Sequence, residues 1–298
     1  MVDFLLGVGV LICVYGITSI SLNLQAGVTG LMNFGQVAFV GIGAYSVAIC
    51  AQNGLPWPLG FAIGAALAAL AGMAVGRLGR TLASDYWAIA TLALAELIRL
   101  VALNEDGLTG GPQGISNIPG LWGSLSGTSA AVATLATAAL LLLLVWFVGR
   151  GLVRSQFGRV LRTLRENPDL AATLGHNVVT SKVRLLGVSA AMAAMAGGFY
   201  AMYISYVGPT QLLPFETFIV FTMVVVGGLG NVTGAIAGSV LIVTLYDGTR
   251  FLRSITDLSA DQAASVRILA VGAVLLAFLL TRTDGLFPER IRRFDAQR

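Results

Sequence analysis

Charged residues are scarce in this sequence, and their scarcity decides the class of protein. Only 11% of the 298 residues are charged, whereas an ordinary soluble domain contains about 25%. Hydrophobic residues make up 56% of the chain, and its mean hydropathy is +0.85. Apolar runs recur that are long enough to cross a hydrocarbon core of about 30 Å, which takes roughly 20 residues as a helix. The sequence therefore predicts an all-α polytopic membrane protein.

Residues that carry catalysis, disulfide bonds or metal ions are equally rare. The two cysteines, Cys13 and Cys50, lie inside apolar segments, and the one histidine, His176, lies in a polar segment. These few positions argue against a disulfide framework. We therefore expect no catalytic site, no metal site and no cofactor bound by this chain. The phosphate-binding pattern GxxxxGK[ST] does not occur, so the usual loop for binding ATP is missing. The sequence does not indicate an enzyme.

Eight segments are candidates for membrane spans, and the seventh is broken by glycines. If that segment crosses twice, about eight to nine transmembrane helices result, in a single domain of residues 1–298. The first run follows Met1-Val2-Asp3, which lacks the positive charge of a signal peptide. The candidate spans are Phe4 to Leu24, Phe34 to Ala51, Trp57 to Gly76, Tyr86 to Leu103, Ala130 to Val148, Val183 to Tyr206, Phe218 to Tyr246 and Ala264 to Leu280.

Basic residues gather in a few connections, as membrane topology requires and as a nucleic-acid surface would not. The connection with the most is the loop 150–182, and the C-terminus and a short third connection carry the rest. We expect all three to be cytoplasmic and the N-terminus to lie outside. The basic residues are Arg150, Arg154, Arg159, Arg162, Arg165, Lys182 and Arg184, then Arg282, Arg290, Arg292, Arg293 and Arg298, and finally Arg77 and Arg80.

Glycines recur at helical spacing in two places. In the third candidate span small residues lie four apart, which leaves one helix face almost without side chains, and a second set follows in the broken region. Such faces predict close helix packing, either within the chain or between subunits. The glycines are Gly60, Gly64, Gly72 and Gly76 in the first set, and Gly230, Gly234 and Gly238 in the second.

Polar residues inside apolar segments are candidates for a translocation path, because they are costly in lipid. Glu96 and Arg99 are spaced to pair on one helix face; they form either a structural ion pair or part of the path. A second set, Asn23, Gln25, Asn33 and Gln36, surrounds glycines that interrupt the helix. Irregular backbone at this depth is tolerated where it is buried in protein or faces water, so this set lines a path or forms a polar loop at the inner interface.

The polar stretch "RENPDLAATLGHN" predicts a short helix between two apolar segments. Asn167 is a good N-cap, Pro168 suits the first turn, Asp169 complements the positive helix end, and Gly175 is a natural stop. About two turns are too short to be stable alone. An apolar stripe and two small residues therefore indicate docking, onto the membrane surface or into a groove of a cytoplasmic partner. The segment comprises Arg165, Glu166, Asn167, Pro168, Asp169, Leu170, Ala171, Ala172, Leu174 and Gly175.

The same stretch resembles the cytoplasmic signature of permease subunits from ABC importers of branched-chain amino acids. The likeness continues in "SLNLQAGVTGLMNFGQVAFVGIGAYSVA", in "SDYWAIATLALAELIRLVALNEDGLTGGPQGISNIPG" and in "GPTQLLPFETFIVFTMVVVGGLGNVTGAIAGSVL". The loop "LTGGPQGI" after the Glu-x-x-Arg helix is most similar to the LivM type. His176 departs from the family pattern, which more often has a small apolar residue there, and this puts the fine packing of the short helix in doubt.

The resemblance implies a permease in the inner membrane of a bacterium, with its C-terminus in the cytoplasm. The short helix would then be a coupling helix that docks on ATPase subunits, which bind ATP and Mg²⁺. The implied partners are a homologous second permease subunit, two ATPase subunits, a periplasmic solute-binding protein and the lipid bilayer, without nucleic acid. Two alternatives stay open: an importer of urea or short amides with the same architecture, and a secondary transporter that works alone.

Overall fold

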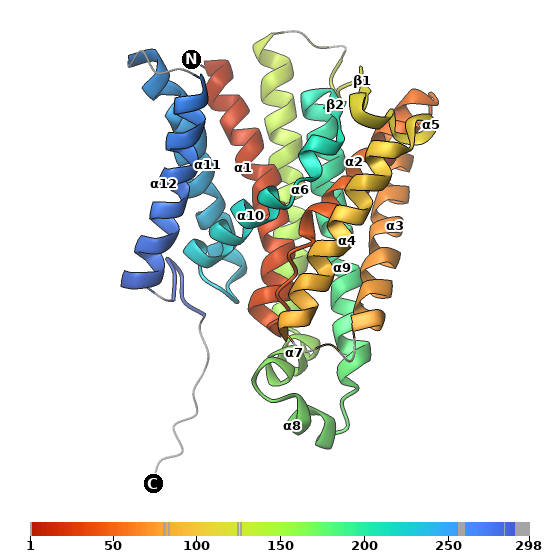
Figure 1. Cartoon of the computed structure of the whole chain (residues 1–298), viewed down its shortest axis with the longest axis vertical. Coiled ribbons are helices and arrows are strands. Elements are labelled where there is room, and N and C mark those ends of the chain that lie inside the picture. The colour runs from red at the N-terminus through yellow and green to blue at the C-terminus, as the bar shows by residue number, and fades with distance from the viewer. Residues whose placement is uncertain are drawn as a thin grey trace.

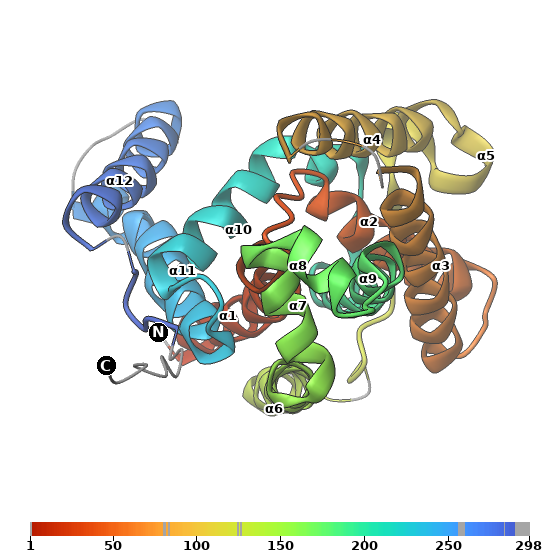
Figure 2. The ribbon, with the colours of Figure 1, turned by 90° about the horizontal axis from the view of Figure 1, so that it is seen from below.

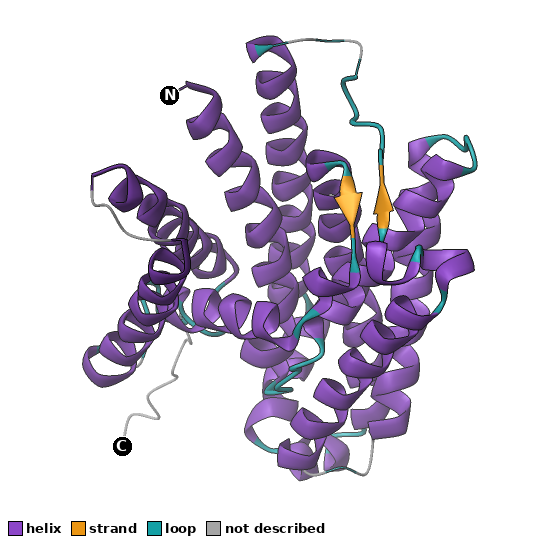
Figure 3. Cartoon of the chain, turned by 45° about the horizontal axis from the view of Figure 1, so that its top comes forward, coloured by secondary structure: helices purple, strands orange, loops and turns teal. Residues whose placement is uncertain are grey.

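The computed structural model describes residues 2–79, 82, 84–123, 125, 127–255, 260–282 and 284–289. Arg80, Arg290, Arg292, Arg293 and Arg298, on which part of the topology prediction depends, lie outside these residues. Most of the described chain is helical, as Figure 3 shows, with one two-stranded ribbon and connecting loops. The prediction of an all-α fold is therefore confirmed in its main feature.

Helices follow one another along the chain with short connections. The first half contains α1 (Val2–Asn23), its π-helical continuation η1 (Leu24–Val28), α2 (Gln36–Gln52), α3 (Trp57–Leu78), α4 (Ser84–Asn104), α5 (Asp106–Thr109), the 3₁₀ turn η3 (Gly111–Gln113) and α6 (Thr128–Arg154). The second half contains α7 (Gln156–Glu166), α8 (Pro168–Thr173), α9 (Val178–Ile204), the 3₁₀ turn η4 (Pro209–Leu212), α10 (Pro214–Gly227), α11 (Val232–Ile255) and α12 (Ala260–Thr281). Strands β1 (Ile115–Ser116) and β2 (Tyr206–Val207) pair antiparallel, with Ile115 opposite Val207.

The predicted number of spans is not confirmed. Within the described residues, five helices are long and apolar enough to cross a membrane, or up to six if the bent pair Pro214–Gly227 and Val232–Gly248 counts as one span. That pair bends by 118°. The physical reason is that the glycine breaks take residues out of the helices. They leave α2 with 17 residues and α10 with 14, fewer than the roughly 20 that a straight span needs.

Helix α1 occupies the middle of the molecule and packs against α6, α9, α10 and α11. Helices α2, α3 and α9 form a compact group on one side of it, and α12 packs on α11 and α10 on the other (Figures 1 and 2). Helix α1 starts at one end of the molecule, whereas α7 and α8 lie at the opposite end (Figure 1). Helix α3 ends toward the end of the molecule that holds α7 and α8 (Figure 1), and the segment after α12 reaches α7, where Glu289 Oε1 accepts from Arg162 Nε at 2.7 Å.

The glycine stripe of α3 lies against α2 and α9 of the same chain. A Cβ at Gly60 would come within 2.9 Å of Val47 Cα in α2, and one at Gly72 within 2.7 Å of the Leu186 carbonyl oxygen in α9. Gly64 faces α2 and Gly76 faces α9 in the same way. In this structure the stripe therefore forms an internal contact, in which backbones approach closely because side chains are missing.

Candidate functional site

The two glycine-rich breaks of the fold meet each other. Asn23, at the end of α1, accepts a hydrogen bond from the Gly230 N–H (2.8 Å) and donates one to the Asn231 carbonyl (2.8 Å). A Cβ at Gly27 would collide with the backbone of Gly230, which itself adopts φ +82°. Gly234 and Gly238, farther along α11, lie against the backbone of α10. One buried asparagine thus ties the first break to the second.

A buried amide network fills the first break. Gln25 donates to Gln36 Oε1 (3.1 Å) and to Ser189 Oγ (2.8 Å), and it accepts from Asn33 Nδ2 (2.8 Å). Gln36 donates in turn to Ser21 Oγ (2.8 Å). These side chains are at most 1% exposed, where an unsatisfied polar group would be costly. The network therefore fixes the irregular backbone between α1 and α2.

The predicted path residues differ in where they lie. Asn23 and Asn33 are occupied by the contacts just described, while Gln36 also lines a cavity. On α4, Arg99 Nε donates to both carboxylate oxygens of Glu96, at 3.0 and 2.9 Å. This pair lines none of the four cavities described for the chain. Its part in a path stays a prediction.

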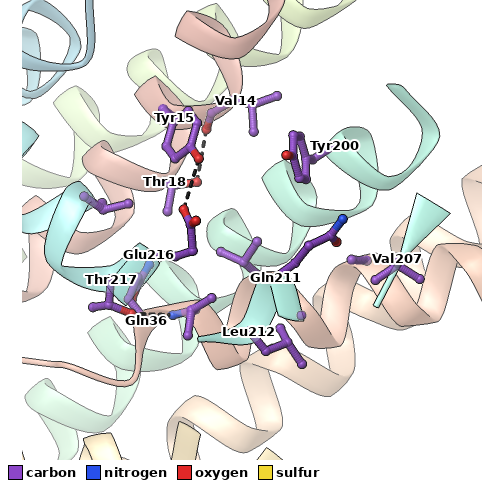
Figure 4. A pocket seen from close by; sticks show the side chains of 15 residues that line it. Val14, Tyr15, Thr18, Gln36, Tyr200, Val207, Gln211, Leu212, Glu216 and Thr217 are labelled. Atoms are coloured by element: carbon purple, nitrogen blue, oxygen red, sulfur yellow. Dashed lines mark hydrogen bonds between the residues drawn. The ribbon is translucent and has the colours of Figure 1, made fainter. Parts of the chain in front are cut away.

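The cavity that Gln36 lines contains the carboxylate of Glu216, which is not among the path residues predicted from the sequence. It lies between α1, α2, α9, η4 and α10, and Tyr15 donates a hydrogen bond to Glu216 across it at 3.1 Å. Figure 4 shows these two side chains pointing toward one another. Glu216 precedes Phe218, where the sequence predicts the broken span to start, and so falls outside that predicted span. Pro214, at the first turn of α10, was the available signal that a helix begins earlier.

The polar segment between α6 and α9 forms two short helices at one end of the molecule (Figure 1). Asn167 caps α8 by accepting from the Leu170 N–H at 2.9 Å, and Gly175 ends the turn with φ +82°. Leu170 is 51% exposed and Leu174 is 63% exposed. Ala171 is buried against the chain itself. The apolar stripe of Leu170 and Leu174 is thus not covered by any described residue of the chain. The residues around it are exposed as well: Glu166, Pro168, Asp169 and Ala172.

Helix α7 connects this segment to both glycine breaks. Arg165 donates to the Gly27 carbonyl in the first break and to Glu289 Oε2 at 2.8 Å. Arg162 donates to Glu289 Oε1 at 2.7 Å. A Cβ at Gly230, in the second break, would lie 2.6 Å from the Glu289 carboxylate. We call Arg162, Arg165 and Glu289 the inner clamp. Its Arg165 therefore faces the fold and not the exposed stripe.

This arrangement defines a class: a polytopic helical membrane protein with broken spans, a cavity between them that contains a carboxylate, and an exposed short helix at one end. The chain belongs to the ABC transporter family described as branched-chain amino acid transport system / permease component, whose family model matches residues 4–280. This is a family of permeases, not of catalytic enzymes.

Curated relatives agree with the family. The chain is 29% identical to the high-affinity branched-chain amino acid transport system permease protein LivM of Escherichia coli, over 94% of this chain and 69% of that protein. It is 26% identical to the probable LivM permease of Methanocaldococcus jannaschii, over 93% of this chain and 91% of that protein. It is 28% identical to the probable LivH permease of the same organism, over 75% and 73%. No solved structure matches the chain. The resemblance to LivM-type permeases is confirmed.

Proposed function

We propose that this chain is one transmembrane subunit of an ATP-driven importer of branched-chain amino acids, and that α8 couples it to separate ATPase subunits. The observation that carries the proposal is the exposed stripe of Leu170 and Leu174 on a capped helix at one end of the molecule. Leucines more than half exposed on a helix too short to be stable alone call for a docking partner.

Two features favour a partner groove over the membrane surface. Helix α8 lies beyond the ends of the neighbouring long helices in Figure 1, so it would project from a bilayer that those helices cross. The stripe also contains only two leucines, four residues apart, whereas the binding of an interfacial helix to lipid scales with the apolar area that it buries. Anchoring residues at successive turns match the helix-in-groove mode of recognition.

The inner clamp supplies a route from α8 to the spans. A movement of α7 would act on the first break through Arg165 and on the second break through Glu289. Packed elements change between discrete arrangements, because interiors resist gradual deformation. An ATP-driven displacement of α8 would thus reach both broken spans together and switch the permease between outward-open and inward-open states.

The finer topology is part of the proposal. Counting α2, α10, α11 and α12 as crossings of a locally thinned or irregular region, beside the five long helices, gives nine crossings, the upper end of the eight to nine expected from the sequence. Helix α7, with its basic residues Arg159, Arg162 and Arg165, lies at one end of the molecule, toward which α3 ends (Figure 1) and which the segment after α12 reaches through Glu289. The positive-inside rule makes this end cytoplasmic. The N-terminus would then lie outside and the C-terminus inside, in the inner membrane of a bacterium.

The proposed partners are a homologous permease subunit, two ATPase subunits that bind ATP and Mg²⁺, and a periplasmic solute-binding protein. Support for the second permease comes from the likeness of this chain to both LivM and LivH relatives. The chain itself would bind no nucleotide, because it has no phosphate-binding loop.

The test is solute uptake by proteoliposomes that contain the complete complex and external binding protein. We expect leucine uptake that requires ATP inside and that unlabelled leucine, but not urea or acetamide, suppresses. If only urea or acetamide suppressed uptake, the transported solute would be a short amide and not an amino acid. Uptake driven by an ion gradient without nucleotide would contradict the ABC mechanism and identify a secondary transporter.

A further inference from the structure

Glu216 lies where two internal cavities adjoin. The first, of about 80 Å³, lies between α1, α2, α9 and α10, and the second, of about 220 Å³, lies between α1, α9, α10 and α11. Tyr15, Tyr200 and Glu216 line both. Neither space alone reaches the roughly 300–1,000 Å³ of usual small-molecule sites. A bound solute would therefore use the space on both sides of Glu216.

Among the residues that the structure describes, no cationic side chain pairs with the carboxylate of Glu216. The only contact described for the Glu216 side chain is the hydrogen bond from Tyr15, at 3.1 Å, although a carboxylate has about four acceptor positions. Among the described residues, no lysine or arginine lines either cavity. Asp247 lines the second cavity and already has an interaction partner. An ionisable side chain at membrane depth is costly and marks a solute or ion path, so Glu216 calls for a ligand that brings a positive charge.

The rest of the lining is suited to an aliphatic group. Val14, Val37, Val40, Val207, Leu212 and Val220 contribute to the first cavity, next to the polar side chains of Gln36 and Gln211. Cavities that are mostly apolar with a few convergent polar groups are typical of small-molecule sites. The polar groups fix orientation, and the apolar wall takes the hydrophobic part of the ligand.

We propose that Glu216, assisted by Tyr15, binds the α-ammonium group of an aliphatic amino acid inside this permease. This inference rests on the proposed function and names the site through which the solute would pass. It also gives the permease a means of discrimination, because urea and short amides carry no ammonium group at neutral pH. A buried site built for a charged hydrogen-bond partner rejects ligands that lack it.

The cavity around Glu216 lies beside the residues that join α10 to α2 and to the first glycine break. Thr217, the next residue on α10, accepts a hydrogen bond from the Val37 N–H at 3.1 Å, and so holds the first turn of α2. Gln36, the residue before Val37, lines the cavity and belongs to the amide network of the first break. A solute that engages Glu216 would thus act on the junction of α10 and α2.

The experiment measures equilibrium binding of radiolabelled leucine to the purified complex in detergent, without the external binding protein. The comparison ligand is 4-methylpentanoate, which keeps the carboxylate and the branched chain of leucine but lacks the ammonium group. We expect Glu216→Gln to weaken leucine binding by about tenfold to a hundredfold, as for loss of a hydrogen bond to a charged group. Binding of 4-methylpentanoate should change less than threefold or improve.

Further variants separate the site from the fold. Glu216→Asp keeps the charge and should retain part of the affinity for leucine. Tyr45→Phe removes a buried hydroxyl that lines neither cavity, and should bind leucine as the unsubstituted complex does. Thermal unfolding of each variant in the same detergent checks that Glu216→Gln leaves a folded complex.

Three results would overturn the inference: equal weakening of both ligands by Glu216→Gln, an unchanged affinity for leucine, or no saturable leucine binding by the unsubstituted complex. The proposed function is judged separately, by ATP-driven leucine uptake with the binding protein present. If that uptake occurs while leucine binding does not depend on Glu216, the site is wrong and the importer stands. If the complex imports only a solute without an ammonium group, both fail.

Discussion

Replacing Leu174 by aspartate should uncouple ATP hydrolysis from transport while leaving the permease folded. The Leu174 side chain is 63% exposed. Burying a whole leucine side chain stabilises by roughly 1.5–3 kcal/mol, so docking of the exposed part would contribute roughly 1–2 kcal/mol. An aspartate in the same groove adds the cost of a desolvated, unpaired carboxylate, which is several kcal/mol. We therefore expect the contact with the ATPase to weaken by about 3 kcal/mol or more, which is roughly a hundredfold.

The fold should not suffer, because exposed surface substitutions usually change stability by less than about 0.5 kcal/mol. A matched control is Thr180→Asp, which adds the same charge on the exposed first turn of α9, where a carboxylate suits the helix end. The assay is ATP-driven leucine uptake and ATPase activity of the complex in proteoliposomes. Uptake should fall in Leu174→Asp and persist in Thr180→Asp. Normal uptake by Leu174→Asp would refute docking of α8 in a partner groove.

Three further predictions concern the body of the permease. Glu289→Gln removes the carboxylate shared by two partly buried ion pairs, with Arg162 and Arg165. It should destabilise the complex by about 1–3 kcal/mol, the cost of leaving buried hydrogen-bonding groups without a full partner, and weaken coupling, measured by thermal unfolding and by uptake per ATP; unchanged unfolding would argue against the inner clamp. Glu96→Gln should reduce uptake, and if it lowers only thermal stability its ion pair is structural. Gly72→Ala should lower the folded yield, since its Cβ meets the Leu186 carbonyl at 2.7 Å, whereas Gly151→Ala, with no atom within 4 Å, should not.

Local rules account for what could be predicted from the sequence. The ends of α8 follow from an N-cap at Asn167, a proline at position 168 and a glycine at 175, and the structure has the helix at Pro168–Thr173. The pairing of Glu96 with Arg99 needs only their spacing on one helix. Both features depend on fewer than ten consecutive residues, so the sequence alone specifies them.

Long-range contacts account for what could not be predicted. Glu289 meets Arg162 across 127 positions of the chain, and Asn23 meets Asn231 across 208. No periodicity or spacing indicates such partners. The number of spans expected from the sequence is not confirmed for a related reason. The glycine breaks between α1 and α2 and between α10 and α11 are stabilised by these distant hydrogen bonds and shorten the helices beside them.

The central claim, that this chain is one subunit of an ATP-driven importer, is tested most directly by purifying it gently from its native membrane and identifying its companions by mass spectrometry. We predict that two ATPase subunits and a second, homologous permease accompany it. A chain that comes out without any ATPase, under conditions that keep other ABC complexes intact, would contradict the account and leave α8 as a helix on the membrane surface.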